Sequence, residues 1–261
     1  MEIVIILFKQ DRDGGWDDKQ NFADLVQELS QAFQPHNWLL SAAVSPAKFR
    51  VNDGYDVKRI AKHLDFINVM TYDLHGSWDR AADHHAPLHK RDHDDWDPLT
   101  TDSGLSYWHQ KGAPLHKILL GTPFYGRSFT LTGGSSEPGA ASSGDGGTPG
   151  KYTDEAGFLS YFEICLLKKE GGWTEKTDSD GNPYMVKGNQ WIGYDTPASI
   201  KRKMEYVKEK NLGGAMIWAI DLDDYVGACG PKWPLLSTMN HELRRKNMIV
   251  RYLLLFNRII L

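Results

Sequence analysis

The chain has 261 residues, of which 41% are hydrophobic and 25% charged, a composition typical of one large globular domain or two modest ones. The formal net charge is −4 and the basic residues are dispersed, which argues against a nucleic-acid-binding surface. The apolar stretches fall short of the roughly 20 residues that span a bilayer, and the first eight residues lack the basic segment and cleavage site of a signal peptide.

Helices and strands are expected to alternate along the chain. Apolar residues at spacings of three and four, or helix-capping residues, predict helices at residues 17–33, 55–63, 105–110, 154–168 and 196–210. Short apolar runs predict strands at residues 38–44, 66–76, 117–125 and 212–222, with further strand signals at 184–194. Residues 133–150 are rich in Gly, Ser and Pro and are expected to form an exposed, mobile loop.

Polar and aromatic side chains follow the apolar part of three of these strands. In the stretch Phe66–Gly76 an apolar run turns polar at Tyr72 and Asp73. Strands that alternate with helices predict a parallel sheet, and a (β/α) barrel builds its active site from the loops after such strands. A doubly wound sheet is the rival, but the glycine-rich first turn of a nucleotide site is lacking. Four βα units are visible where a barrel has eight.

Several sequence blocks occur in the order found in family 18 glycoside hydrolases, the chitinases and chitinase-like lectins, and the chain resembles this family over about residues 12–243. The blocks are Asn21-Phe22, Leu40–Val44, Met70–Trp78, Gly121-x-Pro-x-Tyr125-Gly126-Arg127, Gly188-Asn189-Gln190-Trp191-x-Gly193-Tyr194-Asp195, and Gly213-Gly214-Ala215-Met216-x-Trp218-x-x-Asp221-Leu222-Asp223-Asp224. The resemblance implies an α/β fold, an incomplete (β/α)8 TIM barrel holding strands five to eight. Residues 12–126 and 195–245 would form the C-terminal half of that barrel and 127–194 a small inserted α+β subdomain, while 1–11 and 246–261 do not match.

The same resemblance assigns site residues for chitin or chito-oligosaccharides. Tyr72 is expected to hydrogen-bond the acetamido group of the sugar at subsite −1, and Asp73 to contact that sugar. Trp218 matches the aromatic floor beneath it, where a sugar ring stacks on an indole. The remaining residues implied in substrate binding are Met70, Trp78, Tyr125, Arg127, Glu155 and Met216.

One block of the family is missing. Its strand four carries D-x-x-D-x-D-W-E, whose last residue is the general acid, and residues 1–12 do not contain this motif. A glycosidic oxygen must be protonated to leave, even when the substrate's own acetamido oxygen is the nucleophile. The leading hypothesis is therefore the C-terminal half of a chitinase domain, predicted to be inactive as printed. The alternatives are a chitin-binding lectin without hydrolysis and a fragment that does not fold.

No cofactor and no metal are expected. The spacing of the histidines in residues 84–93 fixes no coordination geometry, and the Ala-Pro-Leu at 86–88 resembles a structural loop of the family. Cys165 and Cys229 could pair or remain thiols, and the residues alone leave both readings open. The resemblance implies that they form a disulfide, that the parent protein is extracellular and that it is a monomer.

Overall fold

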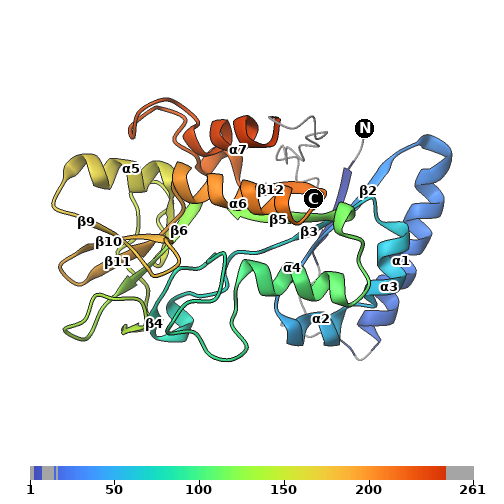
Figure 1. The fold of residues 1–261 in the computed structure, drawn as a ribbon, viewed down its shortest axis with the longest axis horizontal. Helices are drawn as coiled ribbons and strands as arrows, with labels where there is room; N and C mark the ends of the chain where they lie inside the picture. The colour runs from blue at the N-terminus through green and yellow to red at the C-terminus, as the bar shows by residue number, and fades with distance from the viewer. Residues whose placement is uncertain (1–2, 8–14, 16, 245–261) are drawn as a thin grey trace.

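The structure is a computed structural model that describes residues 3–7, 15 and 17–244, with the backbone alone for 3–7. It contains one parallel and one antiparallel sheet, each of five strands, and a short two-stranded pairing in the described residues. The antiparallel sheet lies at one end of the molecule, and helices α1, α2 and α3 lie at the other (Figure 1).

The α-helices are α1 (Asp18–Phe33), α2 (Lys48–Gly54), α3 (Val57–His63), α4 (Thr101–Gln110), α5 (Tyr161–Glu170), α6 (Pro197–Glu209) and α7 (Pro234–Arg244). The first strands are β1 (Ile3–Leu7), β2 (Leu39–Val44), β3 (Phe66–Val69), β4 (Ala81–Ala82), β5 (Ile118–Pro123) and β6 (Tyr125–Thr130). The later strands are β7 (Ala140–Ala141), β8 (Phe158–Ser160), β9 (Thr174–Thr177), β10 (Pro183–Lys187), β11 (Gln190–Gly193) and β12 (Gly214–Trp218). Short 3-10 turns are η1 (Gln34–His36), η2 (Ser77–Asp79), η3 (Leu115–Lys117) and η4 (Ile220–Leu222).

The parallel sheet has the strand order β1-β2-β3-β5-β12. Alternate side chains on one face of its strands, such as Ile67, Leu120 and Ile217, belong to the large core shared with the helices. The other face contributes Phe66 and Met216 to a smaller cluster below the carboxyl ends of the strands. Because every strand points the same way, residues that follow β3, β5 and β12 emerge at one edge. In the described residues no strand pairing closes this sheet into a barrel.

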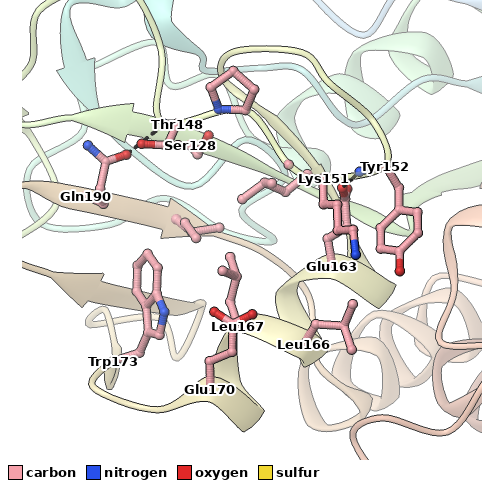
Figure 2. A pocket seen from close by; sticks show the side chains of 14 residues that line it. Ser128, Thr148, Lys151, Tyr152, Glu163, Leu166, Leu167, Glu170, Trp173 and Gln190 are labelled. Carbon is pink, nitrogen blue, oxygen red and sulfur yellow. Dashed lines mark hydrogen bonds between the residues drawn. The ribbon is translucent and has the colours of Figure 1, made fainter.

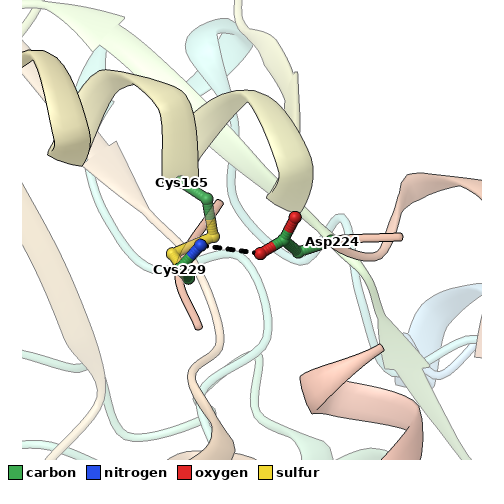
Figure 3. Close-up of side chains that lie close together, drawn as sticks. All are labelled: Cys165, Asp224 and Cys229. Carbon is green, nitrogen blue, oxygen red and sulfur yellow. Dashed lines mark hydrogen bonds between the residues drawn. A yellow bond between two sulfur atoms is a disulfide. The ribbon is translucent and has the colours of Figure 1, made fainter. Parts of the chain in front are cut away.

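The antiparallel sheet, in the order β8-β6-β11-β10-β9, comes from the chain between β5 and β12. Its own core contains Phe129, Tyr184 and Trp191, with the rings of Tyr184 and Trp191 stacked at 5.0 Å. Helix α5 follows β8, and a disulfide joins its Cys165 to Cys229 with a Cα–Cα distance of 5.1 Å (Figure 3). The structure thus contains the disulfide that the resemblance implied. The assignment of residues 127–194 as an inserted domain stays a prediction.

Most expected elements are present, with several corrections. Residues 154–160 are not helical, because α5 begins only after Ser160, whose side chain accepts a hydrogen bond from the Glu163 amide at 3.1 Å. Gly157 has φ +82°, which a right-handed helix does not accept. The loop at 133–150 is not exposed throughout, since Ala140 pairs with Ala82 and is buried. The helix expected at 55–63 is preceded by a separate one, α2.

Two strands also differ from expectation. No strand is expected from sequence at the apolar start of the chain, but β1 pairs in parallel with β2, where Ile3 lies opposite Leu39. β-branched residues favour this pairing, and β2 offers the open edge. The run expected at 117–125 divides, because β5 ends at Pro123 and β6 begins at Tyr125 in the other sheet. This division places Tyr125 and Arg127 beside the carboxyl edge of the parallel sheet.

Among the helices in the described part of the chain, none is long and apolar enough to cross a membrane.

Candidate active site

The residues after β3 turn sharply over the edge of the parallel sheet. Thr71 Oγ1 donates a hydrogen bond to the carbonyl of Gly121 in β5 at 2.7 Å, which holds the segment after the carboxyl end of β3 against β5. Gly121 leaves room for this approach, since a Cβ there would lie 2.4 Å from the Val69 carbonyl oxygen. Asp73 follows with φ +55°, in the left-handed region that non-glycine residues rarely occupy. Such strain concentrates at functional sites, where surrounding contacts maintain it.

Asp73 is the meeting point of two side chains from β6. Its Oδ1 accepts hydrogen bonds from Tyr125 Oη and from Arg127 Nε, both at 2.8 Å. The Asp73 side chain remains 38% exposed, so its second oxygen is available at the surface. The carboxylate is therefore oriented by the protein and still open to a ligand.

His85 supports Asp73 from beneath. Its Nε2 lies 3.1 Å from the Tyr125 carbonyl oxygen, which only accepts, so this nitrogen carries the proton. Nδ1 is then free to accept the Asp73 backbone N–H at 3.3 Å. Burial lowers the pKa of His85, which favours this neutral form.

The ionisation states follow from burial and from the neighbouring charge. Burial by itself would raise the pKa of Asp73, but the contacts with His85 and with the Arg127 guanidinium together more than offset it, and the pKa lies well below its usual range. Burial raises the pKa of both Tyr72 and Tyr125, so their hydroxyls stay protonated. Asp73 is thus an ionised acceptor at neutral pH. It is unsuited to donate a proton to a leaving group.

Aromatic rings surround Arg127. Its guanidinium carbon lies 5.3 Å from the ring centroid of Trp78, 5.6 Å from that of Tyr125 and 5.4 Å from that of Phe158. Trp78 is 56% exposed, so one face of its ring is available for stacking. An exposed indole next to a fixed charge pair suits a ligand that has both apolar faces and polar groups, as sugars do.

The remaining predicted site residues differ in how directly they join this cluster. Tyr72 is buried, with its hydroxyl 3.9 Å from Met216 Sδ, and Met70 packs in the same apolar cluster. Trp218 ends β12 opposite Pro123, at the same edge of the sheet, and is 41% exposed. Glu155 is exposed. Burial lowers the pKa of Arg127, but Asp73 raises it by more, and the charge of Glu155 adds a smaller increase. Their assignment to sugar binding stays a prediction.

Sequence reasoning missed His85 and Phe158. The histidine lies in the loop whose histidine spacing predicts no metal site. The Phe158 ring stacks on Tyr125 at 4.6 Å, and a single aromatic residue before an amphipathic segment gave no signal of that contact. Only the fold brings β8 beside β6.

A separate pocket of about 260 Å³ lies between α5 and the antiparallel sheet (Figure 2). Its floor is apolar, and its polar lining includes Glu163, Lys151 and Gln190. The predicted sugar-binding residues do not line it. In the same region of the chain, Cys165, Asp224 and Cys229 lie close enough to suggest a metal site (Figure 3), but the disulfide withdraws both sulfurs as thiolate ligands.

A parallel sheet with polar and aromatic side chains gathered at its carboxyl edge is the arrangement of barrel-type α/β domains, which build their sites from the loops after the strands. The profile of Glycosyl hydrolases family 18 matches residues 7–223, and the chain belongs to this family.

The relatives carry names of chitinases and chitinase-like proteins. The chain is 46% identical to an endochitinase of Manduca sexta over 244 residues, which is 89% of this chain and 44% of that protein. It is 41% identical to the probable chitinase 10 of Drosophila melanogaster, over 88% of this chain and 10% of that protein. The chain therefore spans less than half the length of these relatives. The activity, substrates and partners of a whole protein are accordingly proposals.

Solved structures show the same fold. Catalytic domain 2 of the Group II chitinase from Ostrinia furnacalis, in complex with a (NAG)5 oligosaccharide, superposes with a TM-score of 0.89 at 40% identity. That match covers 94% of this chain and 67% of the other. Human YKL-39, described as a pseudo-chitinase with retained chitooligosaccharide binding, matches with a TM-score of 0.82 at 39% identity, over 87% of this chain and 66% of the other.

Proposed function

We propose that this chain is a chitinase-type domain that binds β-1,4-linked N-acetylglucosamine polymers at the carboxyl edge of its parallel sheet. The observation that carries the proposal is the Asp73 carboxylate, held by Tyr125 and Arg127 at 2.8 Å beside buried Tyr72. A fixed, ionised acceptor suits an amide N–H or a hydroxyl of an N-acetylated sugar. The exposed indoles of Trp78 and Trp218 suit the apolar faces of the sugar rings.

In the complete reaction of this family, hydrolysis would retain configuration and would be assisted by the substrate. The acetamido oxygen attacks the anomeric carbon, and an oxazolinium intermediate replaces the enzyme ester. In our proposal Tyr72 and Asp73 position the acetamido group for that attack. A separate carboxylic acid must protonate the leaving oxygen.

The printed sequence contains no D-x-x-D-x-D-W-E segment to supply that acid. General acid catalysis is typically worth about 10²–10⁴-fold in rate. We therefore expect the chain as printed to bind chito-oligosaccharides and to release no fluorophore from a fluorogenic chitobioside. Measurable turnover by the purified chain would contradict the assignment of the acid to that segment.

A chitin-binding lectin is the second candidate. It is favoured by the likeness to a human protein described as a pseudo-chitinase that retains chitooligosaccharide binding. Sequencing the transcript upstream of the codon for Met1 separates the two candidates. A continuous reading frame encoding the acid motif supports the hydrolase, and a message that starts at Met1 supports the lectin.

The binding proposal is tested with the indole of Trp218. We expect Trp218→Ala to weaken retention on chitin by about 5–150-fold, because stacking of a ligand ring on an aromatic side chain is worth roughly 1–3 kcal/mol. Trp96→Ala is the matched control, since that indole is 89% exposed and lies on the 90–98 loop. Equal retention of both variants and the unmodified chain would refute the proposed site.

We further propose that the protein acts outside the cell as a monomer. The Cys165–Cys229 disulfide supports an oxidising compartment, because thiols in the cytosol are kept reduced. Sedimentation of the purified chain measures its oligomeric state, and fractionation of expressing cells measures its location.

A further inference from the structure

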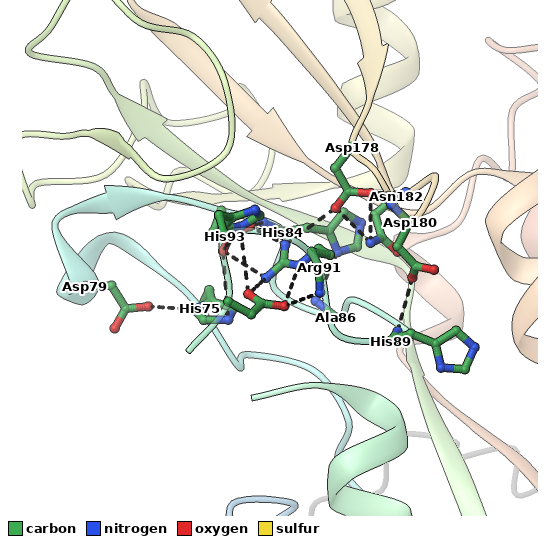
Figure 4. Close-up of polar contacts among 12 residues, drawn as sticks. His75, Asp79, His84, Ala86, His89, Arg91, His93, Asp178, Asp180 and Asn182 are labelled. Carbon is green, nitrogen blue, oxygen red and sulfur yellow. Dashed lines mark hydrogen bonds and ion pairs between the residues drawn. The ribbon is translucent and has the colours of Figure 1, made fainter. Parts of the chain in front are cut away.

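The loop between β3 and α4 folds back on itself and encloses a second polar cluster next to the site (Figure 4). Its centre is the fully buried Arg91. Nη1 of Arg91 pairs with Asp83, Nη2 lies 2.7 Å from Asp94 Oδ1, and Nη1 lies 3.5 Å from Asp178 Oδ2. Each of the three carboxylate side chains is less than a tenth exposed.

The charges of this cluster do not balance. Three buried carboxylates face one guanidinium, which leaves two surplus negative charges away from water. Buried charges without a counter-charge are costly, so proteins pair them or place a metal beside them. The Arg91 pKa is raised despite its burial, because the hydrogen bonds that Arg91 donates to Asp94 and the charge of Asp83 favour the cation. Arg91 therefore supplies one positive charge and no more.

Two histidines from the same loop face these carboxylates. The Nδ1 of His75 lies 3.3 Å from Asp79 Oδ2, and donating a proton to that carboxylate leaves Nε2 as a bare lone pair. This Nε2 is buried, has no hydrogen-bond partner among the described residues, and lies 4.0 Å from Asp83 Oδ2. A nitrogen lone pair aimed at a carboxylate oxygen is repelled by it unless a proton or a metal cation lies between them.

The second histidine completes the set of donor atoms. His93 Nε2 lies 3.2 Å from Asp83 Oδ2 and 3.8 Å from Asp94 Oδ1. The donor atoms of His75, Asp83 and Asp94 all lie within 4.8 Å of one another. Ligands of a tetrahedral zinc ion, at bond lengths of about 2.0–2.2 Å, are roughly 3.4 Å apart. The separations of 3.2 Å and 3.8 Å from His93 Nε2 to the two carboxylate oxygens, and of 4.0 Å between His75 Nε2 and Asp83 Oδ2, lie near that spacing.

We propose that this cluster is a structural Zn²⁺ site, with His75 Nε2, His93 Nε2, Asp83 Oδ2 and Asp94 Oδ1 as ligands. Four protein ligands leave no open position, so the ion would have a structural role. The Asp79 carboxylate orients His75 through its other ring nitrogen, as carboxylates next to zinc-bound histidines commonly do. A divalent ion also removes the surplus of two negative charges.

Arg91 is compatible with the ion, because each carboxylate oxygen has two lone pairs. Nη2 lies 2.9 Å from Asp83 Oδ2 and 2.7 Å from Asp94 Oδ1, which leaves one lone pair on each oxygen for the metal. His93 is one-third exposed and gives the ion a path from solvent. The sequence predicts no metal here, since its linear spacing does not indicate that His75 folds back onto residues 83–94.

The proposed ion would act by restraining the loop that carries its ligands. His75 is two residues after Asp73, and the other ligands lie in the same loop as His85. A bound ion would hold the two ends of this loop together beneath the Asp73 carboxylate. Zinc is therefore expected to stabilise the fold. The same residues are expected to contact the sugar with and without the ion.

The test uses the purified full chain without an affinity tag, stripped with a chelator and titrated with ZnCl2 against a chromophoric competitor. We expect one tightly bound equivalent in the unmodified chain. His75→Ala and His93→Ala should each weaken binding by at least 10-fold, and Asp79→Asn by about 10–100-fold. His89→Ala is the matched control, because the His89 ring packs on Tyr206 at 5.7 Å, and it should bind as the unmodified chain does.

A second readout reports the geometry. Cobalt in place of zinc should give the intense visible absorption of a tetrahedral ion, and zinc should raise Tm of the unmodified chain but not of His75→Ala. Circular dichroism of the metal-free variants establishes that they fold. The proposal is overturned if the unmodified chain binds no saturable equivalent, if both histidine variants keep its affinity, or if cobalt gives a weak octahedral spectrum.

Discussion

Arg127 Nε donates to Asp73 Oδ1 over 2.8 Å and so links the two sheets of the molecule. Asp73 follows β3 of the parallel sheet, and Arg127 lies in β6 of the antiparallel sheet. The position of the carboxylate therefore depends on how the two sheets meet.

This link predicts the effect of a conservative change at Arg127. Arg127→Lys keeps the charge but loses the planar guanidinium that reaches Asp73 through Nε and lies against the aromatic rings. We expect affinity for chitohexaose to fall roughly 5–10-fold, about 1 kcal/mol, with little change in Tm, because Asp73 is partly exposed. Arg202→Lys, whose guanidinium pairs with Asp180 at 3.0 Å, is the control. Calorimetric titration measures both variants, and unchanged affinity would argue against this role.

Gly121 is predicted to be required by the site for steric reasons. A Cβ there would lie 2.4 Å from the Val69 carbonyl oxygen and 3.0 Å from Tyr72 Cε1. Gly121→Ala should therefore destabilise the fold by about 1–3 kcal/mol, and displace Tyr72. Gly133→Ala should be close to neutral, since nothing lies within 4 Å of its Cβ position. Urea unfolding measures both, and equal stabilities would show that the β3–β5 contact is looser than described.

A buried ion pair lies near the site, where Lys203 Nζ is 2.5 Å from Asp195 Oδ2 and both side chains are buried. Lys203→Met should destabilise the protein by about 3–5 kcal/mol, because it leaves a buried carboxylate without its counter-charge. Adding Asp195→Asn should restore part of the loss. Lys201→Met is the control, since the Lys201–Glu205 pair is 3.9 Å apart and exposed, and it should change stability by less than about 1 kcal/mol. Urea unfolding of the four chains provides the comparison.

The stability of the fold is predicted to decrease in mild acid because of His84. Its Nε2 faces the Tyr194 carbonyl at 2.9 Å and its Nδ1 accepts from the Ala86 N–H, which requires a neutral ring. Burial lowers the pKa of His84 from 6.5 to about 3. Between pH 6.5 and pH 3 the unfolded chain binds a proton on His84 that the folded chain does not bind. The stabilisation from neutral His84 is therefore complete above about pH 6.5 and is lost progressively as the pH falls toward 3.

The expected slope from this one group is up to about 1.4 kcal/mol per pH unit. Urea unfolding at pH 4, 5, 6 and 7 measures it. His84→Gln should flatten the dependence, whereas His116→Gln, at an exposed position, should not. Identical slopes for all three chains would assign the acid sensitivity to other groups.

The disulfide is predicted to contribute strongly to stability. Cys165 and Cys229 are 64 positions apart, and cross-linking a loop of that length stabilises by on the order of 4 kcal/mol in the chain-entropy model. The variant Cys165→Ser with Cys229→Ser should lose a similar amount in urea unfolding. Reductant should lower the stability of the unmodified chain and leave the double variant unchanged. A loss of less than about 1 kcal/mol in the free energy of unfolding would contradict the prediction, and would indicate that the unfolded chain is conformationally restricted even without the disulfide.

The local elements could be predicted from sequence where the signals were strong. Thr196 and Pro197 begin α6 as expected, because the Thr196 hydroxyl accepts the Ser199 N–H and Pro fits the first turn. The helix expected at 154–168 was wrong over its first half, where the apolar pattern of β8 continues into α5 without an obvious break.

The site was predicted only as a set of residues. Family resemblance predicted Tyr72, Asp73, Tyr125 and Arg127 as site residues. The hydrogen bonds from Tyr125 and Arg127 to Asp73 could not be predicted from their spacing in the sequence. His85 was missed because a buried histidine that orients a backbone amide looks, in sequence, like any other loop histidine.

The sequence by itself determined the alternation of strands and helices and the family, since hydrophobic periodicity and short sequence motifs are local properties. Only the tertiary structure decided which charges meet. The sheets set the 2.8 Å contacts of Asp73, and the folded 75–94 loop sets the surplus charge around Arg91. Electrostatic energies depend on distance and burial, and both exist only once remote segments have packed together.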